Sequence, residues 1–571
     1  MAKSSLMKML RHAYSIAKMS RKTGIPTDEL LGMVREAKGR NFRTTRRRLL
    51  QGGLGFAGAM AASNFFKGGE RAMAQTTPIL IVGAGIAGLT AAYRLTQAGV
   101  PVNVIEARNR VGGRIRSISK IAGTSIDAEL GAAYIDTDHV CIRDLAAELG
   151  LTEFDLVANE EGLIPEIYFA EGRSIPLEEI INDFAPVAEQ IDQTLIAIDN
   201  FEDYTTFDEP TAAIDNLSIA EYLESIPTST TLRQLLGVAY NAFYGLDAQE
   251  QSSLNLIYVI GTEPDTFQLY GTSDERYRII GGNSQIINNL ANLLQGSIET
   301  STVLEAITSL SDGSYRVSLR SGERTFDRTY ERILLTIPFP VLRQVQLNVD
   351  LPPVKRFAID NYGFGTNSKL HIAFNNPVWR TRFGSSGETY ADLGFQNTRE
   401  VAPTSPTTEG VLEILAGGNL GVVLGSGTPE DHAQRFLPEL DLVYPGISSD
   451  RIGRASRAYW PGELYTQGSY TCYRPGQYVQ FFGVEGERVG NLFFAGEHTS
   501  LDFSGYMEGA CETGEIAAME ILDDLGLAPA VEALRIKQSL SVSPGGRRGR
   551  GPRANNIRDN RNLPTVPRLP R

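Results

Sequence analysis

The sequence has few of the residues on which disulfide-rich folds and metal centres depend. Its 571 residues include only 3 cysteines, Cys141, Cys472 and Cys511, and 5 histidines in scattered positions. An odd number of cysteines without CxxC spacing predicts neither a disulfide framework nor a zinc site. We therefore expect three isolated thiols, mostly in the core, and we assign no metal ligand.

Long apolar runs are also missing from the body of the chain. After residue 75 no stretch of about 18 uncharged apolar residues occurs, whereas a membrane-spanning helix needs about 20. We therefore expect no transmembrane segment in the mature protein. The length is sufficient for more than one domain and a large core.

The net charge of −13 is unevenly distributed. Residues 1–74 carry 15 Lys and Arg against 4 Asp and Glu, and residues 541–571 carry 8 against 1, so residues 75–540 hold a net charge of −31. So acidic a body disfavours nucleic acid as a partner and suits a cationic small molecule. The basic tail, residues 541–571, is rich in Gly, Pro and Arg, and we expect it to be disordered.

The basic N-terminal segment has the parts of an export signal in order. Residues 45–51 read TRRRLLQ and resemble a twin-arginine signal, residues 49–66 are apolar and rich in Gly and Ala, and residues 72–74 form an A-x-A cleavage site. We interpret residues 1–74 as a twin-arginine signal and leader. We expect export of the folded protein to the periplasm or the thylakoid lumen.

A glycine-rich motif near the start of the body organises the rest of the chain. Residues 79–82 are apolar and β-branched, like a buried parallel strand, and Gly83, Gly85 and Gly88 follow before a helix expected at residues 86–98. The first glycine permits a tight turn, the second lets the backbone approach a pyrophosphate, and the third allows close helix–strand packing. The helix N-terminus then faces the phosphates.

The residues after this helix support a dinucleotide site. A second strand, residues 102–105, ends in Glu106, which lies 18 residues past Gly88, where a Rossmann unit holds an acid for a ribose hydroxyl. Residues 108–114 then read RNRVGGR. A nicotinamide enzyme needs no second glycine pair with arginines at this place.

The RxGGR segment and several later motifs resemble those of the flavin-containing amine oxidase family. The resemblance spans roughly residues 77–525, in the family order. The later motifs are DAELGAAY at 127–134, RIIGGNSQ at 278–285, TIPFP at 336–340, FAGEHT at 494–499 and SGYMEGA at 504–510. Desaturases and protoporphyrinogen oxidases share the N-terminal motifs, but we would not expect the last motif with paired tyrosines in them.

The resemblance implies an α/β fold, a Rossmann-like FAD-binding domain with an interleaved α+β substrate domain. The FAD-binding domain is expected at residues 77–152, 272–352 and 455–527, and the substrate domain at residues 153–271 and 353–454. Beyond the first motif we expect helices at residues 141–149, 217–225, 232–244 and 284–294. We expect strands at residues 301–309, 315–319, 330–336, 369–374 and 411–415.

FAD is the cofactor that the resemblance implies, and its binding residues follow from the motifs. Ser469 stands where monoamine oxidases carry the cysteine that bonds to FAD, so the cofactor should be non-covalent. Arg114 should hold the pyrophosphate, Glu497 the ribityl-phosphate region and Val303 the adenine end, while the Met507 N–H faces the flavin. The expected FAD-binding residues are Gly83, Gly85, Ala87, Gly88, Glu106, Ala107, Arg108, Gly113, Arg114, Leu130, Gly131, Ala132, Val303, Trp460, Glu497 and Met507.

Three residues should carry the chemistry. Tyr470 and Tyr506 match the two tyrosines that flank the substrate amine in monoamine oxidases, where ring faces hold the amine and guide an approaching cation. Lys369, in a GxxxK segment followed by PxW, should hold a water against flavin N5 and help reoxidation by oxygen. Tyr134 matches a monoamine oxidase tyrosine at a place where family L-amino acid oxidases often carry an arginine.

The resemblance implies oxidation of a primary amine or an L-amino acid to an imine, with O2 reduced to H2O2. The imine hydrolyses to an aldehyde or a 2-oxo acid plus ammonia. Tyr134 favours an amine, but Arg454 or Arg457 could pair with a substrate carboxylate, so both substrate classes stay open. The alternatives are an amine or amino-acid dehydrogenase and an electron-transfer flavoprotein that passes electrons to a quinone. A homodimer is left open as well.

Overall fold

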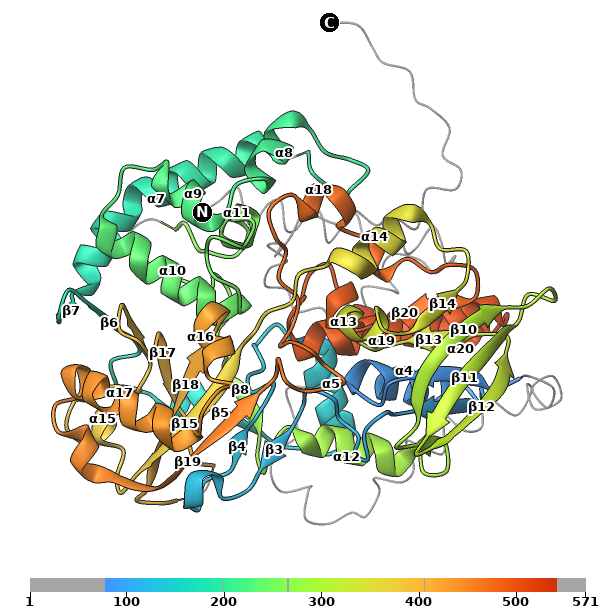
Figure 1. Cartoon of the computed structure of the whole chain (residues 1–571), viewed down its shortest axis with the longest axis horizontal. Helices are drawn as coiled ribbons and strands as arrows, with labels where there is room; N and C mark the ends of the chain where they lie inside the picture. The colour runs from blue at the N-terminus through green and yellow to red at the C-terminus, as the bar shows by residue number, and fades with distance from the viewer. Residues whose placement is uncertain (1–76, 199, 264–265, 405, 542–571) are drawn as a thin grey trace, which may run out of the picture. The chain divides into compact units, whose positions relative to one another are not determined.

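The computed structural model describes residues 77–198, 200–263, 266–404 and 406–541 (Figure 1). The predicted export signal and the basic tail after residue 541 lie outside the described residues. Within the described ranges, every helix is too short or too polar to cross a membrane.

The first sheet is a five-stranded parallel sheet with the order β20–β13–β1–β2–β9. Because β1 pairs with β2 on one side and β13 on the other, its carboxyl end is a topological switch point, where α/β sheets bind ligands. β1 and β2 have the bounds that the sequence predicted. The strands are β1 Ile79–Val82, β2 Val102–Ile105, β9 Ile298–Glu299, β13 Ile333–Leu335 and β20 Leu492–Phe494.

Helices cover one face of this sheet. Ile79 and Ile81 share an apolar cluster with the helices, in which α4 packs on α19 and α19 on α5. Gly514 permits the close approach of α19 to α4, since a Cβ at this position would lie 2.4 Å from the Ala87 carbonyl oxygen. The helices are α4 Ile86–Gln97, α5 Val140–Glu148, α12 Ser284–Leu293, α19 Met507–Asp524 and α20 Ala528–Ser541.

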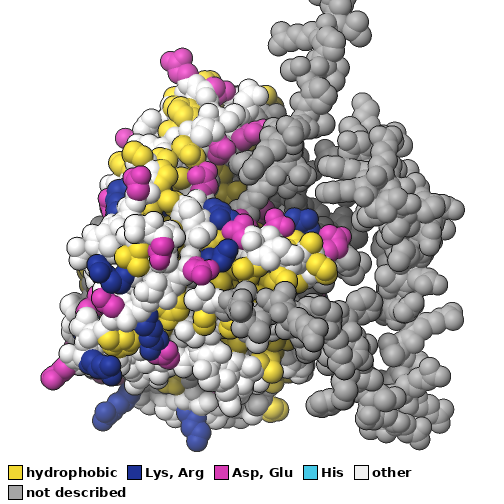
Figure 2. Space-filling view, turned by 90° about the vertical axis from the view of Figure 1, so that its right-hand side faces the viewer, with side chains coloured by type: hydrophobic (Ala, Val, Ile, Leu, Met, Phe, Trp, Pro, Cys, Tyr) yellow, Lys and Arg dark blue, Asp and Glu magenta, His cyan; other side chains and the backbone are white. Residues whose placement is uncertain are grey.

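A four-stranded sheet, β12–β11–β10–β14, packs on the other face of the five-stranded sheet. The sequence did not predict β12, an edge strand whose exposed side chains are charged or threonine and whose apolar signal is therefore weak. Ion pairs such as Arg320 with Glu305 lie on this sheet, and Figure 2 shows charges of both signs interspersed on this side of the molecule. The strands are β10 Val303–Ser309, β11 Tyr315–Ser321, β12 Arg324–Tyr330 and β14 Gln346–Asn348.

A seven-stranded sheet, β19–β15–β18–β17–β16–β6–β7, forms the other part of the molecule with helices α7–α11 (Figure 1). Residues 153–271 were expected to be mainly helical, yet they also supply β6 and β7. The strands are β6 Ile167–Ala170, β7 Arg173–Ile175, β15 Ser368–Phe374, β16 Thr389–Ala391, β17 Asn397–Glu400, β18 Gly410–Ala416 and β19 Arg451–Tyr459.

The two faces of the seven-stranded sheet differ in chemistry. Leu370, Ile372 and Phe374 of β15 pack in an apolar cluster with helices α15 and α17. The alternate residues of the strand, Lys369 and His371, point to the opposite face because side chains alternate along a strand. The helices around this sheet are α7 Leu177–Ala197, α8 Glu209–Asp215, α9 Ile219–Glu224, α10 Thr230–Tyr244, α11 Ser253–Ile257, α15 Val378–Thr381, α16 Gly418–Val423 and α17 Pro429–Val443.

The elements named from the sequence are all present, with ends that differ by at most three residues. The boundaries of the five expected domain segments stay predictions. The remaining strands and α-helices are short. They are β3 Ser117–Ile118, β4 Ala128–Glu129, β5 Glu153–Asp155, β8 Tyr277–Ile279, α6 Leu156–Asn159, α13 Phe339–Leu342, α14 Pro353–Asn361 and α18 Gln477–Phe481.

Candidate active site

A cavity of about 520 Å³ lies at the carboxyl ends of β1, β2, β13 and β20 and extends to the polar face of the seven-stranded sheet. It brings together residues separated by more than 400 positions in the chain. Every expected FAD-binding residue lines this cavity except Gly88 and Leu130, and Tyr134, Lys369, Tyr470 and Tyr506 line it as well.

Gly88 and Leu130 lie outside the lining and contact residues that line the cavity. A Cβ on Gly88 would lie 2.1 Å from the carbonyl oxygen of Gly83, so only glycine lets α4 start this close to β1. The Leu130 carbonyl oxygen accepts a hydrogen bond from the Trp460 indole N–H at 2.8 Å. This bond fixes a ring that lines the cavity.

Two helix N-termini open into the cavity. α4 begins after Gly85 and α19 after Tyr506, and neither N-cap side chain accepts a hydrogen bond from its helix. Space beside Gly85 is open, since no atom lies within 4 Å of where a Cβ would be. Uncapped N–H groups at a positive helix end suit a pyrophosphate and the electron-rich edge of a reduced flavin. The residues present therefore fit FAD.

Glu106 is fixed at the end of β2 by backbone donors. Its carboxylate accepts the Ala84 N–H at 3.0 Å and the Arg108 N–H at 2.9 Å. The side chain is buried and lines the cavity, where an acid can reach a ribose hydroxyl.

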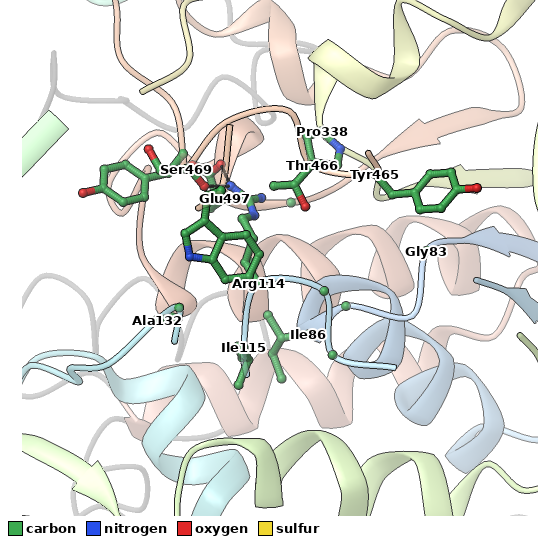
Figure 3. A pocket seen from close by; sticks show the side chains of 18 of the residues that line it. Gly83, Ile86, Arg114, Ile115, Ala132, Pro338, Tyr465, Thr466, Ser469 and Glu497 are labelled. Carbon is green, nitrogen blue, oxygen red and sulfur yellow. Dashed lines mark hydrogen bonds and ion pairs between the residues drawn. The ribbon is translucent and has the colours of Figure 1, made fainter. Parts of the chain in front are cut away.

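The half-buried Arg114 and the buried Glu497 form an ion pair in the cavity wall. Nη1 of Arg114 lies 2.6 Å from Oε1 of Glu497 and 2.9 Å from the Ser469 carbonyl oxygen, and Figure 3 shows the three residues close together. The Glu497 carboxylate also accepts the Gly505 N–H and the Thr471 hydroxyl. Burial would raise the pKa of Glu497, but Arg114, His498 and the Thr471 hydroxyl together keep the pKa below its usual value.

Tyr470 and Tyr506 also line the cavity, and their chain neighbours Thr471 and Gly505 bond to Glu497. The Tyr470 hydroxyl donates to the Phe243 carbonyl oxygen at 2.6 Å, which fixes its ring. The Tyr506 ring makes an edge contact with His139, with centroids 5.0 Å apart. Burial, and then the neighbouring Tyr506, raise the pKa of Tyr470, so its hydroxyl stays protonated. Both side chains are partly buried and present aromatic surface to the cavity.

Lys369 reaches the cavity from β15 and is held by an acid that the sequence analysis missed. Its Nζ lies 3.1 Å from Oε2 of Glu413 and donates to the Glu129 carbonyl oxygen at 3.2 Å. His371 shares the same carboxylate oxygen at 3.1 Å. Burial would raise the pKa of Glu413, but Lys369 and His371 lower it to about 2. The one available signal was a lone acid within the otherwise apolar strand β18.

A second polar group missed by the sequence analysis surrounds Arg399 of β17. Its guanidinium pairs with Glu275 and lies 3.0 Å from Glu388, and it sits over the Tyr134 ring at 5.3 Å. Glu275 has a left-handed backbone with φ of 42°, which is uncommon outside glycine. Burial raises the pKa of Glu275 to about 7 although Arg399 opposes the shift.

The two arginines proposed from the sequence as carboxylate partners lie elsewhere. Arg454 is exposed, and Arg457 donates through Nη1 to the carbonyl oxygens of Leu424, Ser426 and Gly427. Neither lines the cavity. Their positions in β19 could not be read from the sequence because the face on which each side chain lies depends on strand register.

The expectation of three isolated thiols is wrong for two of them. Cys141 Sγ lies 2.9 Å from Cys511 Sγ, because α5 packs on α19. Cys472 is buried elsewhere, with Sγ 3.6 Å from the Asn255 side-chain nitrogen.

The expectation that no residue ligates a metal stays a prediction. Asp136, Asp138 and His139 offer ligand atoms within 4.8 Å of one another. Asp136 already accepts hydrogen bonds from Ser273 and from the Glu275 N–H.

Comparison with known proteins agrees with this geometry. Residues 86–522 match the flavin containing amine oxidoreductase family. The chain belongs to this family. It is 26% identical over 491 residues to amine oxidase [flavin-containing] B of Canis lupus familiaris, covering 81% of this chain and 89% of the relative. It is 25% identical over 477 residues to amine oxidase [flavin-containing] of Oncorhynchus mykiss, covering 80% and 87%.

Solved structures share the fold of this family member. Cyclohexylamine oxidase from Brevibacterium oxydans IH-35A has a TM-score of 0.68 at 22% identity, covering 79% of this chain and 100% of that one. Putrescine oxidase with bound putrescine has a TM-score of 0.67 at 19% identity, covering 78% and 99%. The predicted family, the α/β FAD-binding fold and the FAD cofactor are thus confirmed. The protein is a flavin-containing oxidoreductase that acts on amines.

Proposed function

We propose that this enzyme oxidises primary amines that carry no carboxylate beside the amino group, with non-covalent FAD and with O2 as the electron acceptor. The observation that carries the choice of substrate is the pairing of Arg399. Arg399 is the arginine that lies over Tyr134 at the cavity, and Glu275 and Glu388 already occupy its two terminal nitrogens.

The cavity wall already holds two acids, Glu275 and Glu388, against the one guanidinium of Arg399. A substrate carboxylate would add a third negative charge at this buried site, and a buried charge without full compensation costs about 3–5 kcal/mol. A substrate without a carboxylate avoids this cost, and its amino group is drawn toward an acidic cavity as a cation.

The roles of the cavity residues follow from this arrangement. When bound, FAD supplies the capacity to take a hydride equivalent from the carbon that bears nitrogen and to pass the electrons on to O2, which gives H2O2. Tyr470 and Tyr506 hold the amine between aromatic surfaces. Lys369, kept beside the cavity by Glu413, places positive charge where oxygen gains electrons. The imine product then hydrolyses to an aldehyde and ammonia.

The experiment is a peroxide assay on the purified holoprotein with a panel of monoamines, diamines and L-amino acids, with catalase as the control. Peroxide formed with at least one amine supports the proposal. Reduction of an artificial dye without peroxide would instead support a dehydrogenase. Bound FAD that no panel member reduces would support an electron-transfer flavoprotein.

We further propose that the chain is exported through its twin-arginine segment. The proposal rests on the order of the arginine pair, the apolar run and the A-x-A site within residues 45–74. Replacement of Arg46 and Arg47 by lysine should leave the precursor in the cytoplasm. Unchanged export of this double variant would overturn the assignment.

A further inference from the structure

Two thiols from distant parts of the chain meet behind the cavity. Cys141 is the second residue of α5 and Cys511 the fifth of α19, and their Sγ atoms are 2.9 Å apart. The two sulfur atoms need to approach by only about 0.9 Å to reach the bond length of a disulfide. Cys141 is half-buried as a residue, whereas Cys511 is fully buried.

The backbone around the pair is held in place by Glu508. Its two carboxylate oxygens accept the N–H groups of Cys141 and Ile142, each at 2.8 Å. Glu508 therefore caps the first turn of α5 from the first turn of α19. The hydroxyl oxygen of Thr90 in α4 lies 3.8 Å from the Cys511 Sγ. The approach of the two sulfur atoms is thus built into the packing of three helices.

We propose that Cys141 and Cys511 are a dithiol pair that hydrogen peroxide oxidises to a disulfide. One peroxide oxidises the two thiols, the S–S bond forms as two S–H bonds and the O–O bond break, and two water molecules leave. The step needs a peroxide as oxidant. Where the proposed function holds, the enzyme makes this oxidant itself, and the inference rests on that function only for the source of the peroxide.

The chemistry of the thiols sets the speed of closure. The neighbouring Cys511 thiol, and then burial, raise the pKa of Cys141 well above the usual value for cysteine. Because the thiolate is the reactive form, closure is slow at neutral pH and needs sustained exposure to peroxide. The fraction of protein with the disulfide therefore reflects the total exposure to peroxide and not the peroxide from a single turnover.

The bond would tie α5 to α19 beside the cofactor cavity. Met507 and Ala510 of α19 line the cavity, and Cys511 follows Ala510 directly. The crosslink spans 370 residues, so it restricts the unfolded chain strongly. The oxidised protein should therefore hold the helix at the flavin end of the cavity more firmly than the reduced protein does.

The direct test is a thiol map of the purified holoprotein after exposure to added H2O2, without any amine. Denaturation, alkylation and non-reducing peptide mapping should show the Cys141 and Cys511 peptides linked and Cys472 alkylated, so that reactive thiols fall from three to one. Alkylation of all three thiols after exposure would overturn the proposal. Oxidation of Cys141 to a sulfinic acid, with Cys511 still a free thiol, would also overturn the proposal.

Variants separate the crosslink from general oxidation damage. In Cys472→Ala the same linked peptide should form, whereas Cys141→Ala should leave Cys511 reduced. The unfolding midpoint should rise by at least about 3 °C on oxidation of the wild type and not of Cys141→Ala. Equal midpoints for oxidised and reduced wild type would contradict the crosslink. Because the peroxide is added, a failure of amine turnover leaves this test unaffected.

Discussion

The Nζ of Lys369 lies 3.1 Å from Oε2 of Glu413, and the pair faces the cavity from two neighbouring strands of the seven-stranded sheet. In the β15–β18 register, His371 lies opposite Glu413 and Lys369 opposite Leu415, so the lysine reaches diagonally to the acid. A carboxylate whose pKa falls to about 2 stays charged over the whole physiological range. It places a fixed negative charge beside Lys369, where we expect oxygen to react.

Loss of the lysine charge should slow the oxidative half of the reaction. In Lys369→Met we expect reoxidation of the reduced enzyme by O2 to slow by at least about tenfold, because positive charge no longer stabilises the electrons gained by oxygen. Stopped-flow absorbance of the flavin measures this rate. FAD affinity, measured by titration of apoprotein, should change less.

Glu413→Gln is the matched variant for this pair. It leaves Lys369 buried without its carboxylate, so it should lower the free energy of unfolding as well as the reoxidation rate. An oxidative rate in Lys369→Met equal to that of the wild type would refute the role of the lysine.

The cofactor should leave the protein on acid precipitation. Ser469 lines the cavity at the place of the monoamine oxidase cysteine, and its hydroxyl donates to the Asn367 side-chain oxygen at 2.6 Å. A serine hydroxyl forms no thioether, and Cys472 lies buried outside the lining. Flavin absorbance should therefore appear in the supernatant after precipitation. Flavin retained in the washed pellet would contradict non-covalent binding.

Removal of one acid from the Arg399 cluster should shift specificity toward amino acids. In Glu275→Gln a terminal nitrogen of Arg399 loses its carboxylate partner and can bind a substrate carboxylate. The ratio of kcat/KM for an L-amino acid to that for the corresponding amine should rise by about tenfold, or about 1.4 kcal/mol. Glu161→Gln, at an exposed position, is the control and should leave this ratio unchanged. A ratio unaltered in Glu275→Gln would argue against the assigned role of Arg399.

His498 should make the protein sensitive to acid. Burial lowers the pKa of His498 to about 3, from about 6.5 in an unfolded chain, although Glu497 opposes the shift. Between these values the unfolded state binds the extra proton, so stability falls as the pH drops below about 6.5, by up to about 1.4 kcal/mol per pH unit. The free energy of unfolding, measured with denaturant at several pH values from 4.5 to 7, should depend less steeply on pH in His498→Gln than in the wild type. The same dependence on pH in both proteins would contradict a neutral buried histidine.

The cofactor side of the site could be predicted because its signals are local. Gly83, Gly85 and Gly88 are required by backbone geometry within one turn, and such spacing is readable without tertiary structure. The strand and helix around them differ from the prediction by one residue at most.

The substrate side could not be predicted in the same way. Arg399, Glu275 and Glu388 come from three separate segments. Pairing of β16 with β17 brings Glu388 to Arg399, whereas Glu275 reaches Arg399 from the segment before β8, which pairs with β5. A single charged residue in a strand does not reveal which face it occupies until the register is fixed. The thiol pair was missed for a similar reason, since the packing of α5 on α19 joins residues 370 positions apart.

The most direct test compares amines with the amino acids that differ from them only by the carboxylate. Suitable pairs are cadaverine with L-lysine and 2-phenylethylamine with L-phenylalanine, assayed for peroxide with the holoprotein under identical conditions. We predict that kcat/KM for the better amine exceeds that for its amino acid by at least about a hundredfold, or about 2.8 kcal/mol. Equal or higher values for the amino acid in every active pair would contradict the proposed substrate class.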